Sequence, residues 1–267
     1  MAASLLIAAS TPNAAAGVAN GGTKLSGPNV VRYAAPGDGP TIVIQGIRLG
    51  DGCLFRLAGT TATSDPHSRY EEAAFDPTTC ESEIRVVQAD YRDTSAGASD
   101  SDGGGVNGGN SAPVLAGAAL STSTALCSNP NADKTHYYAD SACIHSWFSD
   151  PANFHVNDLT NEVQWNPSGG CANSGAAYAS WYAQWLSATG WYLVSNQFSP
   201  SFSCSGVTSL SYTKFWNGSF CGPSLPTDTW YWPQTITGLA NGSYTWSTQW
   251  YKDGVCSILL SFGYQPG

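Results

Sequence analysis

The sequence has few basic residues, and their distribution excludes several classes of partner. Ten of the 267 residues are Lys or Arg and nineteen are Asp or Glu, which gives a formal net charge of −9. After residue 92 the only basic residues are Lys134, Lys214 and Lys252. A nucleic-acid-binding protein needs a basic face that displaces counterions from phosphates, and anionic membranes select for a similar surface. The sequence therefore predicts neutral partners, such as a glycan or another protein surface, and no nucleic acid.

The short motifs of common enzymes and cofactor sites are also missing. The chain has no Gly-x-Ser-x-Gly nucleophile elbow, no His-Glu-x-x-His, no phosphate loop and no dinucleotide fingerprint. It has no apolar run of about 18 residues, the length needed to cross a bilayer. These absences favour a non-catalytic protein, although they leave catalysis open, and they predict no cofactor and no membrane span.

The eight cysteines include no Cys-x-x-Cys pair. Metal-binding and redox cysteines usually need that close spacing, whereas an even, dispersed set is typical of disulfides formed in an oxidising compartment. We therefore predict a secreted protein with a Cys53–Cys80 disulfide, because both residues open strands of one small meander. Cys171–Cys204 and Cys221–Cys256 are nearest-neighbour pairings that the sequence leaves open. The predicted disulfide residues are Cys53, Cys80, Cys127, Cys143, Cys171, Cys204, Cys221 and Cys256.

The composition is typical of an all-β protein. Aromatic residues make up 12% of the chain, and 29 Gly and 15 Pro accompany a single Met. Residues that form turns recur between short runs of strand-forming residues. We predict an antiparallel β-sandwich at 126–267, preceded by a small antiparallel β-meander unit at 28–92. The Gly-, Ser- and Asp-rich segment 93–125 predicts a linker, and residues 1–27 predict a signal-peptide remnant or a disordered leader.

A Gln-Trp pair followed by a turn and a cysteine occurs twice, at 164–171 and at 249–256. We expect two equivalent hairpins, with Trp165 and Trp250 in the core. Residues 178–186 carry aromatics at helical spacing, but we predict strands there, with a hairpin turn over 185–191.

Tryptophan is concentrated in the second half of the chain. Planar aromatic side chains offer flat apolar surface for a sugar ring, although each of them could instead fill the core. Alternation along a strand places Trp230 and Trp232 on one face and Tyr231 on the other. The candidate binding residues are Trp181, Trp185, Trp230, Tyr231 and Trp232.

An alternative function, a secreted hydrolase, would draw its site from His145, His155, Asp158 and Glu162. His155 and Asp158 are three residues apart, which puts them on opposite faces of a regular strand. We therefore predict scattered histidines and no metal site. Asp158 and Glu162 share a face, but such spacing also occurs on any solvent-facing edge. A third possibility is a self-assembling structural surface protein.

Several segments resemble a recurrent type of exported protein from actinobacteria and related bacteria. They are Phe75–Cys80, Ser149–Pro151, His155–Asp158, Gly190–Trp191, Asn217–Cys221 and Lys252–Ser261, with the Trp165-x5-Cys171 spacing. The resemblance implies secretion and a β-rich, disulfide-containing fold. That family has no known activity, so the resemblance supplies no catalytic residues. The expected function is binding or surface interaction, with a glycan or a cell-envelope component as the candidate ligand.

Overall fold

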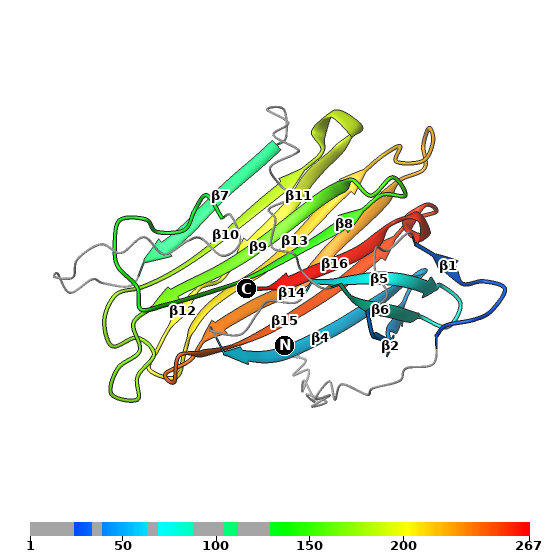
Figure 1. Cartoon of the computed structure of the whole chain (residues 1–267). Helices are drawn as coiled ribbons and strands as arrows, with labels where there is room; N and C mark the ends of the chain where they lie inside the picture. Colours follow the sequence, from blue (N-terminus) through cyan, green and yellow to red (C-terminus); the bar gives the residue numbers. More distant parts are fainter. Residues whose placement is uncertain (1–23, 34–38, 63–68, 88–103, 112–128) are drawn as a thin grey trace, which may run out of the picture.

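The computed structural model of the chain describes residues 24–33, 39–62, 69–87, 104–111 and 129–267. In these residues sixteen strands form two antiparallel sheets that pack face to face. The strands of both layers run in similar directions (Figure 1), as in an aligned β-sandwich. The predicted all-β sandwich is confirmed. The described residues contain no helix long and apolar enough to span a membrane.

The larger layer is a nine-stranded sheet. Eight of its strands follow one path, and β1 (Val31–Arg32) pairs with β5 beside that path. In spatial order the path is β2 (Thr41–Gln45), β6 (Glu81–Val87), β5 (Arg69–Asp76), β16 (Ser261–Pro266), β8 (Asp140–Ser149), β9 (His155–Trp165), β10 (Ala177–Trp185) and β7 (Gly104–Ser111).

The smaller layer is a seven-stranded sheet. Along its long strands buried and partly exposed residues alternate, because one face packs on the other sheet and the other face meets solvent. In spatial order its strands are β11 (Trp191–Phe198), β13 (Val207–Asn217), β14 (Thr227–Gly238), β15 (Ser243–Asp253), β4 (Gly52–Ala62) and β3 (Ile47–Leu49), and β12 (Ser201–Phe202) pairs with β13.

The strands of residues 28–92 do not form a sheet of their own. β4 pairs with β15 in the seven-stranded sheet, and β5 pairs with β16 in the nine-stranded sheet. The pairing differs from the predicted separate meander because the C-terminal strands leave an edge open in each layer, and unpaired edges recruit strands. Residues 104–111, predicted to belong to a linker, form β7 and pair with β10. The rest of the predicted linker up to residue 125, and residues 1–23 of the predicted leader, lie outside the described residues.

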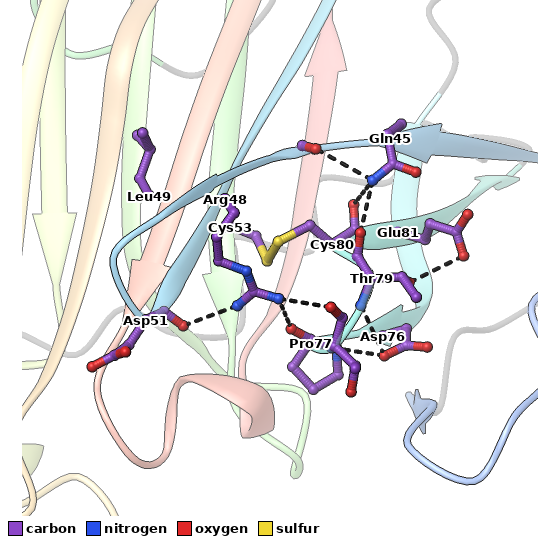
Figure 2. Close-up of a disulfide and its surroundings, with 12 residues drawn as sticks. Gln45, Arg48, Leu49, Asp51, Cys53, Asp76, Pro77, Thr79, Cys80 and Glu81 are labelled. Carbon is purple, nitrogen blue, oxygen red and sulfur yellow. Dashed lines mark hydrogen bonds between the residues drawn. A yellow bond between two sulfur atoms is a disulfide. The ribbon is translucent and has the colours of Figure 1, made fainter.

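The Cys53–Cys80 disulfide joins the two layers, as Figure 2 shows. Cys53 lies in β4 of the seven-stranded sheet, and Cys80 precedes β6 of the nine-stranded sheet. Around the disulfide, the Arg48 guanidinium donates a hydrogen bond of 3.0 Å to the Thr78 carbonyl, and the Gln45 amide donates one of 2.8 Å to the Thr79 carbonyl. This end of the sandwich is therefore fixed by a covalent bond and by side chains that bind the β5–β6 turn.

Two further disulfides have the nearest-neighbour pairing. Cys171, after β9, bonds to Cys204, before β13, and so links the two layers. Cys221, in the β13–β14 loop, bonds to Cys256, after β15, at the opposite end of those strands. Cys143 is also disulfide-bonded. Cys127 lies outside the described residues.

The two Gln-Trp motifs place their tryptophans in the core, as predicted, but they do not form equivalent hairpins. Trp165 and Trp250 are both fully buried. β9 and β10 pair within the nine-stranded sheet. β15, in contrast, leads to β16 in the other layer, so the second motif crosses between sheets. Only the first motif is a hairpin.

The strand prediction for 178–186 is confirmed by β10, which spans 177–185. The predicted hairpin at 185–191 is wrong. β10 lies in the nine-stranded sheet and β11 in the seven-stranded sheet, and a short 3-10 turn over Ser187–Thr189 joins them. Trp185, at the end of β10, and Trp191, at the start of β11, both pack on the interior between the layers. The chain therefore passes from one sheet to the other at this turn.

The interior also contains a buried ion pair. Lys252 Nζ lies 2.7 Å from Glu72 Oε2, and both side chains have 0% exposure. Lys252 also donates to the Leu260 carbonyl, and Glu72 accepts from Ser82 Oγ and the Phe262 amide. Burial lowers the pKa of Lys252, and the Glu72 carboxylate opposes that shift. The charges are tolerated because each has several partners.

Candidate functional site

The outward side of the seven-stranded sheet carries a group of aromatic side chains, which we call the aromatic face. They come from four neighbouring strands, β11, β13, β14 and β15. Tyr192 and Trp232 are 45% and 54% exposed, and the other members are partly exposed. The aromatic face consists of Tyr192, Tyr212, Trp216, Trp230, Trp232 and Tyr251.

Cross-strand pairing brings these rings together in rows. Tyr192 is in register with Trp216, and their ring centroids are 4.9 Å apart. Trp230 is in register with Tyr251, and their centroids are 4.8 Å apart. Lys214 lies on the other side of Trp230, with its Nζ 4.4 Å from the ring centroid. The result is a set of cross-strand aromatic pairs on one side of the sheet, with a cation over one of the rings.

Trp232 lies at a β-bulge in β14. Ser211 pairs with Gln234 and Thr213 pairs with Tyr231, so Trp232 and Pro233 together oppose the single residue Tyr212. The extra residue lets Tyr231 and Gln234 both face the core although they are three apart, while Trp232 projects outward. The Trp232 and Tyr212 rings then meet edge to face, with centroids 6.5 Å apart.

The ring of Tyr251 is held flat against the sheet. Its hydroxyl donates a 2.8 Å hydrogen bond to the Leu49 carbonyl. The ring lies directly over Gly52, where a Cβ would come within 3.0 Å of it. A ring fixed in this way loses little conformational entropy when a ligand packs on it.

Of the five predicted binding residues, only Trp230 and Trp232 lie on the aromatic face. Tyr231 is fully buried and its hydroxyl donates to the Asn157 carbonyl at 3.0 Å. Trp181 is 8% exposed, and Trp185 packs on the core with its ring 6.0 Å from that of Phe215.

The sequence reasoning missed Tyr192, Tyr212, Trp216 and Tyr251. For β13 a signal was present: Tyr212, Lys214 and Trp216 stand at every second position, which places them on one face of a strand. Which face was outward depended on the register between the layers.

A second group of side chains lies on the outward side of the nine-stranded sheet. His145 of β8 and His155 and Asp158 of β9 form a cluster, which we call the histidine cluster. His145 Nε2 and His155 Nδ1 each lie 3.3 Å from Asp158 Oδ2. The three ligand atoms all lie within 4.8 Å of one another.

A β-bulge explains why the prediction of scattered histidines was wrong. Ser149 of β8 pairs with His155, and the residue before it, Phe148, pairs with Asn157. Val156 therefore has no partner in β8 and is an extra residue in β9. The extra residue reverses the alternation, so His155 and Asp158 share the outward face despite their spacing of three. Sequence alternation alone gives the opposite result.

The surroundings of the histidine cluster are aromatic and partly closed. The Trp147 ring stacks on His155, with centroids 4.9 Å apart, and it also contacts His145. Burial by itself raises the pKa of Asp158, but the two imidazoles outweigh that effect and hold this pKa well below its usual range. Asp158 Oδ1 is buried and has no hydrogen-bond partner among the described residues.

Glu162 does not belong to the histidine cluster, although it shares the outward face of β9 with Asp158 as predicted. It is 3% exposed. Burial raises its pKa to about 7, against the opposing effects of an Asn129 hydrogen bond and the charge of Lys134. The segment that holds Asn129 covers this part of the sheet, since Asn129 Nδ2 also donates to Ser180 Oγ. A carboxylate pair facing an open cleft is therefore not formed by Asp158 and Glu162.

No protein-family model, curated protein or solved structure matches this chain. The two outward faces are therefore the basis for assigning a function.

Proposed function

We propose that the protein is a secreted, non-catalytic binding protein that holds a neutral glycan along its aromatic face. The observation that carries this proposal is the set of six aromatic side chains directed outward from four neighbouring strands. Monomeric proteins rarely expose a large group of apolar side chains, and where they do the group usually marks an interaction site.

The chemistry of the aromatic face suits a sugar. The C–H side of a pyranose ring is apolar and packs on a flat aromatic ring, while its hydroxyls need polar partners at the edge. Lys214 and Asp228 provide such partners next to Trp230, joined by an ion pair of 2.9 Å. The net charge of −9 disfavours polyanionic ligands.

Three disulfides among the described residues support a location outside the reducing cytosol. The resemblance to exported actinobacterial proteins points in the same direction. We propose an extracellular or cell-envelope location on these two grounds.

The test is binding of the purified, oxidised protein to neutral polysaccharides, soluble ones by affinity electrophoresis and insoluble ones by sedimentation. Binding should persist at 1 M NaCl, because stacking on a neutral ligand is not screened. Trp232→Ala and Trp216→Ala should each weaken binding about tenfold or more, as truncation of a central aromatic contact does.

Phe154→Ala is the matched control, since Phe154 is an exposed aromatic (62%) between β8 and β9, away from the aromatic face. It should bind as the unmutated protein does. Absence of binding to every neutral polysaccharide, with the fold intact by circular dichroism, rejects the glycan proposal. Release of reducing ends would instead support the hydrolase, and concentration-dependent oligomers lost in Trp232→Ala would support self-assembly through the same face.

A further inference from the structure

We propose that the histidine cluster is a binding site for one divalent transition-metal ion of the Zn²⁺ type. The ligands are His145 Nε2, His155 Nδ1 and a carboxylate oxygen of Asp158, supplied by the adjacent strands β8 and β9. This site lies on the opposite layer from the aromatic face and does not depend on glycan binding.

The separations match those of a metal site. With Zn–N and Zn–O bonds near 2.0–2.2 Å, tetrahedral geometry puts neighbouring ligand atoms roughly 3.3–3.5 Å apart. Both imidazole nitrogens lie 3.3 Å from Asp158 Oδ2. The longest separation, between the two imidazole nitrogens, is at most 4.8 Å, and a rotation of the partly exposed His145 side chain would reduce it while the strands and the His155 ring stay in place.

Ordinary hydrogen bonding describes the histidine cluster less well, as a second His–Asp pair in the same protein shows. His136 Nδ1 lies 2.6 Å from Asp133 Oδ2, a distance typical of a charge-assisted hydrogen bond. In the histidine cluster two imidazoles instead share one carboxylate oxygen at 3.3 Å each. The three ligand atoms therefore lie close enough together to bind a single cation.

Asp158 supplies an independent observation. Its Oδ1 atom is buried but has no hydrogen-bond partner among the described residues, which is a costly arrangement for a carboxylate oxygen. A cation bound by this carboxylate would satisfy that atom, either directly or through a metal-bound water.

The identity of the ion follows from the ligand types. Two imidazoles and one carboxylate suit Zn²⁺ and its neighbours in the first transition row, whereas Ca²⁺ and Mg²⁺ prefer all-oxygen sites. Three protein ligands leave a coordination position for water. The side chains of His145 and His155 are 26% and 32% exposed, so that position is open to solvent.

Trp147 is the side chain that positions the ligands. Its ring stacks on His155 at an interplanar angle of 12° and lies over Gly263 of β16, where no Cβ obstructs it. The ring also contacts the guanidinium of Arg69, whose Cζ lies 4.9 Å from the ring centroid. The indole therefore fixes the His155 ring plane and shields one side of the site from water.

The experiment is equilibrium dialysis of the full, oxidised, chelator-treated chain against Zn²⁺. We expect one Zn²⁺ per chain with a dissociation constant in or below the micromolar range. His145→Ala, His155→Ala and Asp158→Asn should each weaken binding at least tenfold, since even outer-shell changes in metal sites cost tenfold to a hundredfold. His136→Ala is the matched control and should leave affinity unchanged, because His136 pairs with a single carboxylate.

Co²⁺ added to the unmutated protein gives a second readout that needs no variant. Bound Co²⁺ should develop visible d–d absorption that excess Zn²⁺ removes. A Co²⁺ spectrum identical to that of the free ion, absence of Zn²⁺ binding at micromolar concentration, or equal loss of affinity in His136→Ala and His155→Ala each overturns the proposal. Because glycan binding is measured separately, either proposal can fail alone.

Discussion

The two outward faces of the sandwich use the same structural device for different chemistry. The seven-stranded sheet directs six aromatic rings to solvent, whereas the nine-stranded sheet directs two histidines and an aspartate beside one tryptophan. Each face contains a β-bulge, at Trp232–Pro233 in β14 and at Val156 in β9, but only the bulge in β9 brings a site residue, His155, to a face that regular alternation would not give it. A bulge changes which face a side chain takes while the inward residues on either side of it stay in the core. Regular alternation therefore accounts for the outward position of Trp232, whereas the position of His155 beside Asp158 depends on a bulge.

The largest expected effect comes from the buried ion pair that joins the two sheets, because both faces depend on the same packed interior. Lys252→Met leaves the Glu72 carboxylate buried without its cation, which should cost about 3–5 kcal/mol of the free energy of unfolding. Urea denaturation measures this loss. The double variant Lys252→Met/Glu72→Gln should recover part of it, because the amide is neutral and its oxygen still accepts from Ser82. A loss below 1 kcal/mol in Lys252→Met would show that the ion pair is not structural.

The next effect is a pH dependence of stability that comes from the nine-stranded sheet. The pKa of Glu162 is about 7 in the fold, against an ordinary value of 4.5. The unfolded chain therefore releases this proton first, so stability is fully present below pH 4.5 and is lost as pH rises to about 7. The loss is at most about 1.4 kcal/mol per pH unit, or about 3 kcal/mol over the 2.5 units between the two pKa values.

Glu162→Gln removes this dependence. Urea midpoints should be similar for the variant and the unmutated protein at pH 4.5, and higher for the variant at pH 8. Asp51→Asn, an exposed position in the β3–β4 turn, is the control and should follow the unmutated protein. Equal pH profiles for Glu162→Gln and the unmutated protein would contradict the buried, neutral carboxyl.

Much of the fold could be predicted because its signals are local. Alternation, turn residues and cysteine spacing were enough for the strands, the sandwich and the Cys53–Cys80 bridge. The assignment of strands to layers could not be predicted, because it depends on which edge each strand meets after the chain has collapsed. The hairpin predicted at 185–191 failed for this reason: a turn looks alike in sequence whether it returns within a sheet or crosses to the other one.

The candidate sites were predictable only where strands are regular. The opposite orientation of Trp230 and Tyr231 follows from simple alternation, and the structure has it. The union of His155 with Asp158 does not follow, since the extra residue Val156 is defined by its partner strand and leaves no mark in the local sequence. Sequence alone identified suitable residue types but not their convergence.

A smaller, paired effect separates the two faces through glycines that lie beneath aromatic rings. A Cβ at Gly52 would come within 3.0 Å of the Tyr251 ring, and one at Gly263 within 3.0 Å of the Trp147 ring. Each Gly→Ala change should cost about 1–3 kcal/mol of stability through overpacking. Gly52→Ala should weaken glycan binding and leave Zn²⁺ affinity unchanged, and Gly263→Ala should do the reverse. If both variants lose both activities, the faces are coupled through the core and the contrast between them fails.

The smallest expected effect concerns the one cation on the aromatic face. Lys214 and Asp228 form an ion pair whose side chains are 28% and 23% exposed, so Lys214→Met should change the free energy of unfolding by only about 0–1 kcal/mol. The same change also removes the contact between Lys214 Nζ and the Trp230 ring, worth about 0.5–1 kcal/mol at an exposed site. Glycan affinity should fall by less than about fivefold, and Asp228→Asn, which keeps the cation over the ring, should lower it less. If Lys214→Met instead abolishes binding while Trp232→Ala does not, the ligand is recognised by charge and not by stacking. The aromatic face would then, like the histidine cluster, act through a charged side chain.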